Sequence, residues 1–253
     1  SIGTMSGTSF DGVDAALMRT DGENYIKFIS SAFLPYSDKE KKLYKSSFFN
    51  NFDFLTKSIN DKHIEVIKKL LTETSLKSSS IDLIGLHGQT LFHKPEEKWS
   101  WQYINPEKLV KEFKTKVISD FRLNDINNGG EGAPLVPIYH AAIIKEFIKT
   151  LPVAILNVGG VSNVTIVKKD GSFIGFDIGP GNGPIDSIVS SRLNLDFDIA
   201  GKISKKGKIN YNISKKIVFE IEKLGSRRSY DRNILDQICL KETIDINVED
   251  SLA

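Results

Sequence analysis

The chain has 253 residues, of which 40% are hydrophobic and 26% charged, enough apolar material to bury a core in one large or two small domains. Its 34 basic and 32 acidic side chains give a formal net charge of +2, and the basic ones occur in short pairs, which disfavours a nucleic-acid-binding protein. Cys239 is the only cysteine, so an intramolecular disulfide and a thiolate metal cluster are excluded. No apolar run approaches the length of a membrane span, and we predict a cytoplasmic protein.

Residues 2–33 are expected to form three antiparallel strands, over 2–5, 13–19 and 25–33. The first turn is dense in Gly, Ser and Thr and is closed by Asp11 and Asp14. Crowded amides and hydroxyls can cradle phosphate oxygens, while a nearby carboxylate holds Mg²⁺ directly or through water. The turn matches neither the GxxxxGK[ST] loop nor the GxGxxG fingerprint, so a nucleotide site here would belong to another class. The alternative is an ordinary hairpin.

Two helices are expected next, over residues 37–48 and 52–73. The first begins with the capping box Ser-Asp-Lys-Glu, and the second carries apolar residues at near-helical spacing. Both helices are therefore predicted to pack on the core. His63, within the second, is predicted to be partly exposed.

A buried strand is expected over residues 81–86, and it ends in His87-Gly88-Gln89-Thr90. These side chains offer imidazole, amide and hydroxyl groups together, which suits hydrogen bonding to a polar ligand. A metal site at His87 and His93 is disfavoured, because neither a cysteine nor a suitably spaced carboxylate accompanies them. Aromatic residues share one face of the next strand, which is either core, the favoured interpretation, or a surface for stacking a sugar: Trp99, Trp101 and Tyr103.

Arg122 follows the next expected strand and lies in the sequence between Asp120 and Asp125. An arginine flanked by carboxylates is either part of a structural ion pair or a clamp for a carboxylate or phosphate of a substrate. A glycine-rich loop over residues 129–134 and a helix over 136–148 follow.

A second set of three strands is expected over residues 153–157, 163–167 and 173–177. It repeats the plan of the first 33 residues, with Gly159-Gly160 in its first turn and an Asp-Gly pair in its second. The repeat predicts two related lobes that face one another, with the phosphates of a nucleotide held by both first turns. We place the first lobe at residues 1–150 and the second at 151–253.

The last of these strands ends at Asp177 and is followed by a turn rich in Gly and Pro, before a helix begins at Ile185. A carboxylate at the end of a strand, beside the amides of a helix start, suits phosphoryl chemistry. The alternative is a surface turn.

Five motifs, in this order, resemble one family: GTMSGTSFDGVDAAL, GLHGQT followed by FH, DFR with GGEGAPLVP, LNVGGVSNVT and FDIGPGN. They resemble the 1,6-anhydro-N-acetylmuramic acid kinases, members of the actin-like, ribonuclease H-like superfamily of ATPases and sugar kinases. The resemblance implies an α/β fold of two lobes around a nucleotide cleft. The sequence departs from the family pattern at Glu131, where Gln is usual, and at Ile178, where a small or polar residue is usual. Because the family continues beyond residue 253, the second lobe is expected to be truncated and the chain a fragment.

The resemblance implies that ATP and water open the anhydro ring of 1,6-anhydro-N-acetylmuramic acid while O6 is phosphorylated, a step in peptidoglycan recycling. Asp177 matches the catalytic aspartate, which takes a proton from the attacking water. The residues that match the ATP-binding segments are Gly7, Thr8, Ser9, Phe10, Asp11, Gly12, Val13, Asp14, Gly159 and Gly160. The candidates for the sugar pocket are His87, Gln89, Asp120, Arg122 and Asp125.

ATP and Mg²⁺ are the expected cofactors. Whether Asp11 or Asp14 holds the metal, directly or through water, is left open. The expected partners are the amino sugar and ATP, and similar enzymes are homodimers. One rival interpretation is an inactive fragment or relative that binds sugar or nucleotide, against which the intact Asp177 and phosphate turns count. The other is a regulatory actin-like ATPase, which would not need the DFR and GGEGAP motifs.

Overall fold

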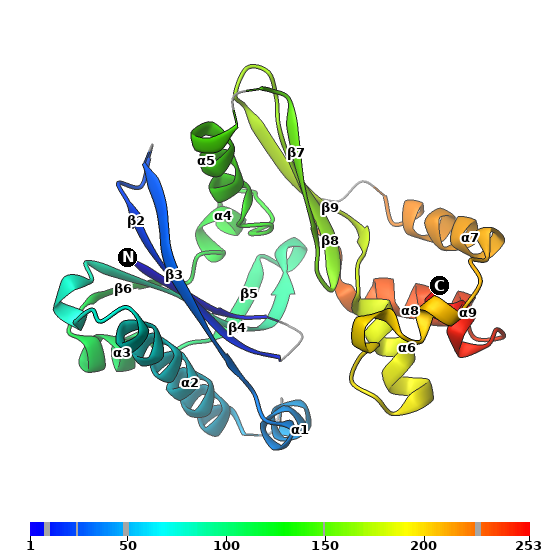
Figure 1. Cartoon of the computed structure of the whole chain (residues 1–253), viewed down its shortest axis with the longest axis horizontal. Helices are drawn as coiled ribbons and strands as arrows, with labels where there is room; N and C mark the ends of the chain where they lie inside the picture. Colours follow the sequence, from blue (N-terminus) through cyan, green and yellow to red (C-terminus); the bar gives the residue numbers. More distant parts are fainter. Residues whose placement is uncertain (8–10, 24, 48–50, 149, 226–228) are drawn as a thin grey trace. The chain divides into compact units, whose positions relative to one another are not determined.

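The computed structural model describes residues 1–7, 11–23, 25–47, 51–148, 150–225 and 229–253. The chain is α/β and divides into two compact units, Ser1–Gly132 and Ala133–Ala253, each with a sheet of its own (Figure 1). The division lies after Gly132, earlier than the expected boundary at residue 150. Helix α5 (Pro137–Phe147) belongs to the second unit because it packs on strands of that unit's sheet.

The sheet of the first unit has the strand order β3-β2-β1-β4-β5, and β6 pairs with β4 off this path. Its strands are β1 (Ile2–Ser6), β2 (Gly12–Thr20), β3 (Ile26–Pro35), β4 (Leu83–Lys94), β5 (Trp99–Tyr103) and β6 (Lys116–Ser119). The predicted hairpins β1-β2 and β2-β3 are confirmed. Strand β4 runs past the expected end at residue 86, because its first half pairs with β1 and β6 in parallel and its second half pairs with β5.

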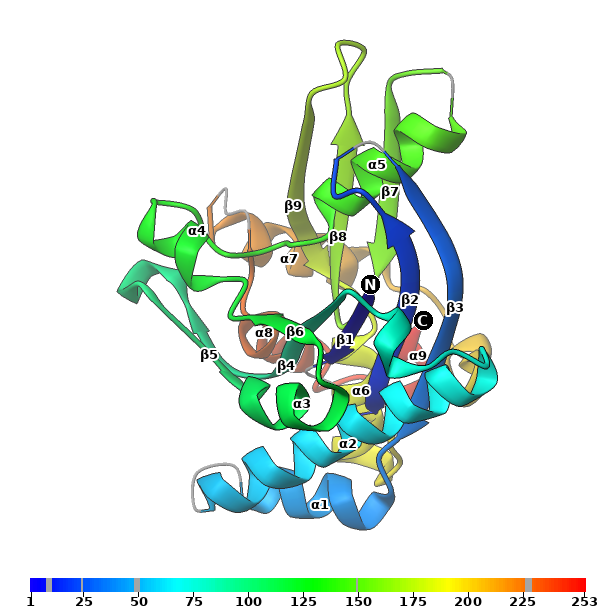
Figure 2. The same ribbon diagram turned by 90° about the vertical axis from the view of Figure 1, so that its left-hand side faces the viewer.

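The helices of the first unit are α1 (Asp38–Ser47), α2 (Phe52–Glu73), α3 (Pro106–Phe113) and α4 (Leu123–Asn127), with 3₁₀ turns at Ser78–Ser80 and Pro95–Glu97. Figure 2 shows α2 running across the sheet, and it contacts each of the strands β1 to β5. The predicted capping box is formed, since the Ser37 amide and hydroxyl both donate to Glu40.

The prediction that His63 is partly exposed is wrong, because its exposed fraction is 0%. The residue lies four positions from Ile59 and from Ile67, so it occupies the same buried face of α2. Its Nδ1 atom lies 2.8 Å from the Thr4 hydroxyl, which itself donates to the carbonyl oxygen of Asp14. Burial, together with the nearby His87, lowers the pKa of His63 to about 3, so the imidazole is neutral.

The second unit contains the predicted second meander, a sheet of order β7-β8-β9. Its strands are β7 (Val153–Val158), β8 (Val161–Val167) and β9 (Phe173–Pro180). Its remaining helices are α6 (Gly183–Leu193), α7 (Tyr211–Glu222), α8 (Arg232–Glu242) and α9 (Val248–Leu252), with 3₁₀ turns at Ile199–Gly201 and Ser204–Lys206. Strand β9 continues past Asp177 because its last residues still pair with β8, and α6 begins two residues before the expected Ile185.

The two units differ in the size of their cores. In the first unit, α2 and the sheet enclose one large cluster that includes Leu55, Leu70 and Leu86, each fully buried. In the second unit the described cluster consists of Ile188, Val189 and Leu252 with partly buried neighbours. Leu156 and Val158 on β7 remain more than half exposed, at 58% and 52%.

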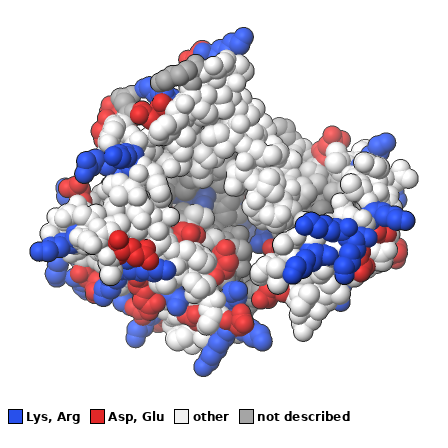
Figure 3. All heavy atoms as spheres, in the orientation of Figure 1, with Lys and Arg blue, Asp and Glu red and all other residues white. Residues whose placement is uncertain are grey.

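Charged side chains of both signs are interspersed over much of the face drawn in Figure 3. This distribution agrees with the near-balance of basic and acidic residues in the sequence. None of the helices in the described part of the chain combines the length and the apolar character that a membrane crossing requires.

Candidate functional site

The ends of the first glycine-rich turn are joined by buried hydrogen bonds. Ser6 Oγ lies 2.5 Å from Gln89 Oε1 and 3.0 Å from the Gly12 carbonyl oxygen. Gln89 is fully buried, so in this structure its amide supports the turn rather than facing solvent. Thr8, Ser9 and Phe10 lie outside the described residues, whereas Gly7 directly follows β1 and Gly12 begins β2.

Asp11 and Asp14 close this turn, and both are exposed. Asp11 Oδ1 accepts a hydrogen bond from the Gly12 amide at 3.1 Å, whereas Val13 between them is fully buried. Partial burial raises the pKa of Asp14, and the negative charge of Asp11 raises it further. Two carboxylates that repel one another in this way suit a divalent cation held through water. Among the described residues, no cluster of three or more His, Cys, Asp or Glu side chains is placed to bind a metal.

His87 and Arg122 form a buried pair, although 35 residues separate them. Arg122 Nε and Nη2 lie 3.2 and 2.8 Å from His87 Nε2, and Nη1 donates to the Gly132 carbonyl oxygen at 2.7 Å. Because His87 Nδ1 lies 3.0 Å from the Gly88 carbonyl oxygen, the neutral tautomer with its proton on Nδ1 satisfies both contacts. Burial and the Arg122 charge lower the pKa of His87 to about 4.

Asp120 and Asp125 flank Arg122 in the sequence, but neither forms an ion pair with it in this structure. Asp125 instead accepts a hydrogen bond from the Gly132 amide at 2.7 Å, and a Cβ atom on Gly130 would lie 2.1 Å from Asp125 Oδ2. Asp120 follows β6 with a left-handed φ of 60°. Arg122 thus binds the carbonyl oxygen of Gly132 and Asp125 binds its amide, so both side chains fix the glycine-rich loop at this residue. Their contact with a sugar, and that of His87, Gln89 and Asp120, stays a prediction.

In the second unit, Asp177 lies on β9 opposite Asn163 of β8. The carboxylate is partly buried, and its Oδ2 atom accepts a hydrogen bond from the backbone amide of Tyr230 at 2.9 Å. Tyr230 precedes α8, which packs against β9. The sequence analysis did not single out Tyr230 as a partner of Asp177. The two residues are 53 positions apart, and a backbone donor has no signature in the sequence.

The Gly159-Gly160 turn is joined to the turn between β9 and α6. The Asn182 amide donates to the Gly159 carbonyl oxygen at 2.7 Å, and the Gly181 and Gly183 amides both donate to the Gly160 carbonyl oxygen at 3.1 Å. The predicted phosphate turn and the segment that follows Asp177 therefore form one hydrogen-bonded structure.

We expect Gly181→Ala to destabilise the protein by about 1–3 kcal/mol, because a Cβ atom there would lie 2.1 Å from the Gly159 carbonyl oxygen. Gly159→Ala is the matched control, since its Cβ atom would meet nothing closer than 3.4 Å. Urea unfolding should show a lower midpoint for Gly181→Ala and an almost unchanged one for Gly159→Ala. Equal midpoints for the two variants would contradict the described packing of these turns.

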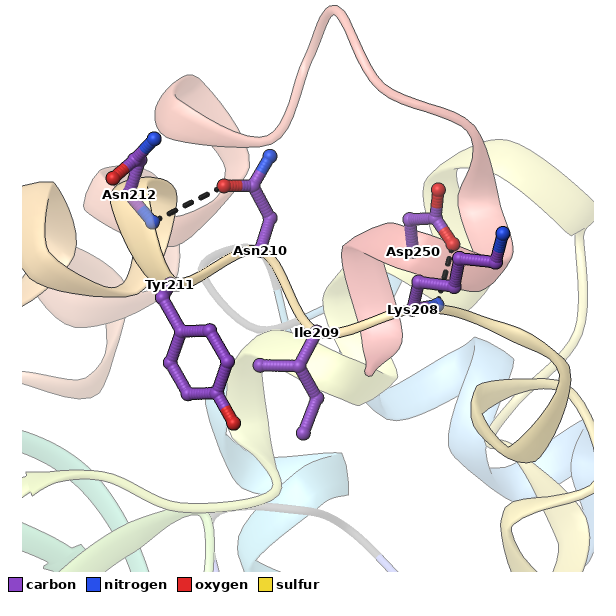
Figure 4. Close-up of a pocket in the computed structure, with 6 residues that line it drawn as sticks. All are labelled: Lys208, Ile209, Asn210, Tyr211, Asn212 and Asp250. Atoms are coloured by element: carbon purple, nitrogen blue, oxygen red, sulfur yellow. Dashed lines mark hydrogen bonds between the residues drawn. The ribbon is translucent and has the colours of Figure 1, made fainter.

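A separate cavity of about 420 Å³ lies beside the start of α7 (Figure 4). Its polar side chains serve the backbone: Asn210 Oδ1 accepts from the Asn212 amide at 3.2 Å, and Asp250 Oδ1 accepts from the Lys208 amide at 2.6 Å. Tyr211 and Ile209 point to the same side in Figure 4. The cavity lacks the candidate residues identified from the sequence.

A family model described as anhydro-N-acetylmuramic acid kinase matches residues 1–221. The chain is 38% identical over 227 residues to an anhydro-N-acetylmuramic acid kinase of Zymomonas mobilis, covering 84% of this chain and 62% of that protein. It is 32% identical over 254 residues to the protein of the same name in Rhodopseudomonas palustris, covering 95% and 69%.

A solved structure of the ethanolamine utilization protein EutJ from Carboxydothermus hydrogenoformans superposes with a TM-score of 0.38 and 10% identity, covering 96% of this chain and 80% of that one. The chain spans about three fifths to two thirds of the length of the relatives that it matches.

Proposed function

The chain belongs to the anhydro-N-acetylmuramic acid kinase family, and we propose that the protein uses ATP and water to convert 1,6-anhydro-N-acetylmuramic acid into N-acetylmuramic acid 6-phosphate and ADP. The observation that carries the proposal lies in the second unit. There the partly buried Asp177 lies on the last strand of the meander whose first turn, Gly159-Gly160, is hydrogen-bonded to the turn between β9 and α6. In the proposed reaction the carboxylate would serve as the base and the glycine turn would contact a phosphate.

Asp177 is proposed as the general base. The oxygen of water attacks C1 of the sugar, the bond from C1 to O6 breaks, and O6 takes the γ-phosphoryl group of ATP. Asp177 accepts the proton that the water loses. The hydrogen bond from the Tyr230 amide orients the carboxylate.

The proposed ATP contacts are the first turn, from Gly7 to Asp14, and the Gly159-Gly160 turn. Backbone amides of such turns bind phosphate oxygens. Mg²⁺ would neutralise phosphate charge when bound, and the mutually repelling carboxylates of Asp11 and Asp14 suit it. We propose that the hydrogen bond from the Ser6 hydroxyl to the Gly12 carbonyl oxygen keeps the ends of the first turn together.

We further propose an actin-like fold with two related lobes. The repeated three-strand meander supports it, because β1-β2-β3 and β7-β8-β9 have the same antiparallel order.

The expected partners are the amino sugar, ATP and a second copy of the protein, with no nucleic acid. A cytoplasmic location is proposed as well, because the single cysteine of this sequence can form no intramolecular disulfide.

The reaction is tested by incubating the chain with 1,6-anhydro-N-acetylmuramic acid and ATP in ¹⁸O-labelled water and analysing the products by mass spectrometry. We expect the label at C1 and the phosphate on O6. The Zymomonas mobilis relative, assayed in parallel, is the positive control. Product from the relative and none from this chain would contradict the proposal and favour the interpretation as an inactive relative that binds sugar or nucleotide.

A further inference from the structure

Arg232 is the first residue of α8. Its side chain packs against the Gly159-Gly160 turn and against the turn between β9 and α6. A Cβ atom on Gly160 would lie 3.3 Å from Cδ and from Nη1 of Arg232. A Cβ atom on Gly183 would lie 2.9 Å from Arg232 Nε and 2.7 Å from the Gly160 carbonyl oxygen. Glycine at both positions therefore lets the guanidinium approach the turn backbone closely, and the Arg232 side chain is only 24% exposed.

The guanidinium of Arg232 differs from two other partly buried arginines in how it uses its donors. Arg122 bonds through Nε, Nη1 and Nη2, and Arg192 bonds through Nη1 and Nη2 to two carbonyl oxygens and the Ser251 hydroxyl. Arg232 has one acceptor among the described residues, Asp236 Oδ2, which lies 3.4 Å from Nε. Its Nη1 and Nη2 atoms, which carry four of its five N–H groups, have no acceptor there.

Asp236 positions the Arg232 side chain. It is 8% exposed, and its Oδ2 atom also accepts a hydrogen bond from the Ser187 hydroxyl of α6 at 2.7 Å. This contact ties α8 to α6 and fixes the Nε edge of the guanidinium. An exposed ion pair four residues apart on a helix contributes little stability, whereas in this one, which lies within α8, the Arg232 side chain is only 24% exposed and the Asp236 side chain 11%.

The segment that carries Arg232 also reaches Asp177. Tyr230 lies two residues earlier and donates its amide to the Asp177 carboxylate at 2.9 Å. The same short segment thus places one donor on the proposed base and a guanidinium on the proposed phosphate turn. Arginine is well suited to phosphate because its planar fork presents two parallel N–H donors and keeps its charge when buried.

We propose that Arg232 binds a phosphate group of the nucleotide at the Gly159-Gly160 turn through Nη1 and Nη2, with Asp236 as the residue that positions it. This inference rests on the proposed function, because the nucleotide site at that turn is itself a proposal. It adds a side-chain cation to the proposed phosphate turn.

The test is isothermal titration of ATP, and of tripolyphosphate as a phosphate chain without a nucleoside, into the wild-type chain and three variants. Arg232→Met should weaken binding of both ligands about 10- to 100-fold, because it removes a charged, two-pronged hydrogen bond. Arg232→Lys keeps the charge and loses the fork, so an intermediate loss is expected. Lys241→Met, an exposed cation on the same helix, controls for net charge and should bind as the wild type does.

Unchanged affinity for both ligands in a folded Arg232→Met variant would overturn the inference and leave the proposed function standing. If circular dichroism shows that Arg232→Met does not fold, the decision passes to Arg232→Lys, for which wild-type affinity overturns the inference. Absence of ATP binding by the wild-type chain would instead overturn the proposed function, and the inference with it.

Discussion

Asp177→Asn is expected to lower kcat about 100- to 10,000-fold while changing the affinity for ATP by less than about threefold. The amide cannot accept a proton from water, whereas its Oδ1 atom can still accept the hydrogen bond that the Tyr230 amide donates to the carboxylate. The fold around β9 should therefore persist. Turnover is measured by the formation of N-acetylmuramic acid 6-phosphate, and ATP affinity by titration calorimetry.

Asp196→Asn is the matched control, because Asp196 is an exposed aspartate of the same unit. It should leave both quantities unchanged. A loss of ATP binding together with turnover in Asp177→Asn would show that Asp177 is structural and would remove it from the proposed reaction.

Acidification from pH 7 to pH 5 is expected to destabilise the protein by roughly 2 kcal/mol for each of two buried histidines. Burial lowers the pKa of His63 to about 3 and that of His87 to about 4, whereas an unfolded histidine titrates near 6.5. Both groups therefore bind protons more readily when unfolded. Their stabilising contribution is complete above pH 6.5 and is lost as the pH falls towards the folded pKa values.

His87 should contribute to this loss through a specific contact. Once protonated, its Nε2 atom can no longer accept from Arg122, and two positive groups then face each other within 3.2 Å. Urea unfolding at pH 7 and pH 5 measures the effect. His87→Gln retains an acceptor for Arg122 without titrating, and it should lose about half of the pH dependence. An equally steep pH dependence in this variant would assign the effect to other groups.

The repeated meander could be predicted because it depends on local signals, namely alternating apolar residues and glycine-containing turns. The end of β4 could not, because its second half is a strand by virtue of pairing with β5 rather than by its own pattern. Strand β9 likewise extends to Pro180 because β8 offers a partner there.

The roles of polar side chains were harder to infer than the elements that carry them. Arg122 has carboxylates beside it in the sequence, yet it binds His87, which the topology of β4 and β6 brings near. The burial of His63 could have been inferred from its four-residue spacing to Ile59 and Ile67, but a polar side chain was expected at the surface. The contact of Arg232 with Gly160 depends on the packing of α8 and has no local signal.

The unequal cores of the two units should give the units different rates of local unfolding. The first unit encloses its central strands in a large apolar cluster, whereas the second has the small cluster of Ile188, Val189 and Leu252. Amide hydrogens of the second unit should consequently exchange with solvent through smaller, more frequent openings than those of the first. A nucleotide that binds this unit would raise its stability and so reduce the frequency of these openings.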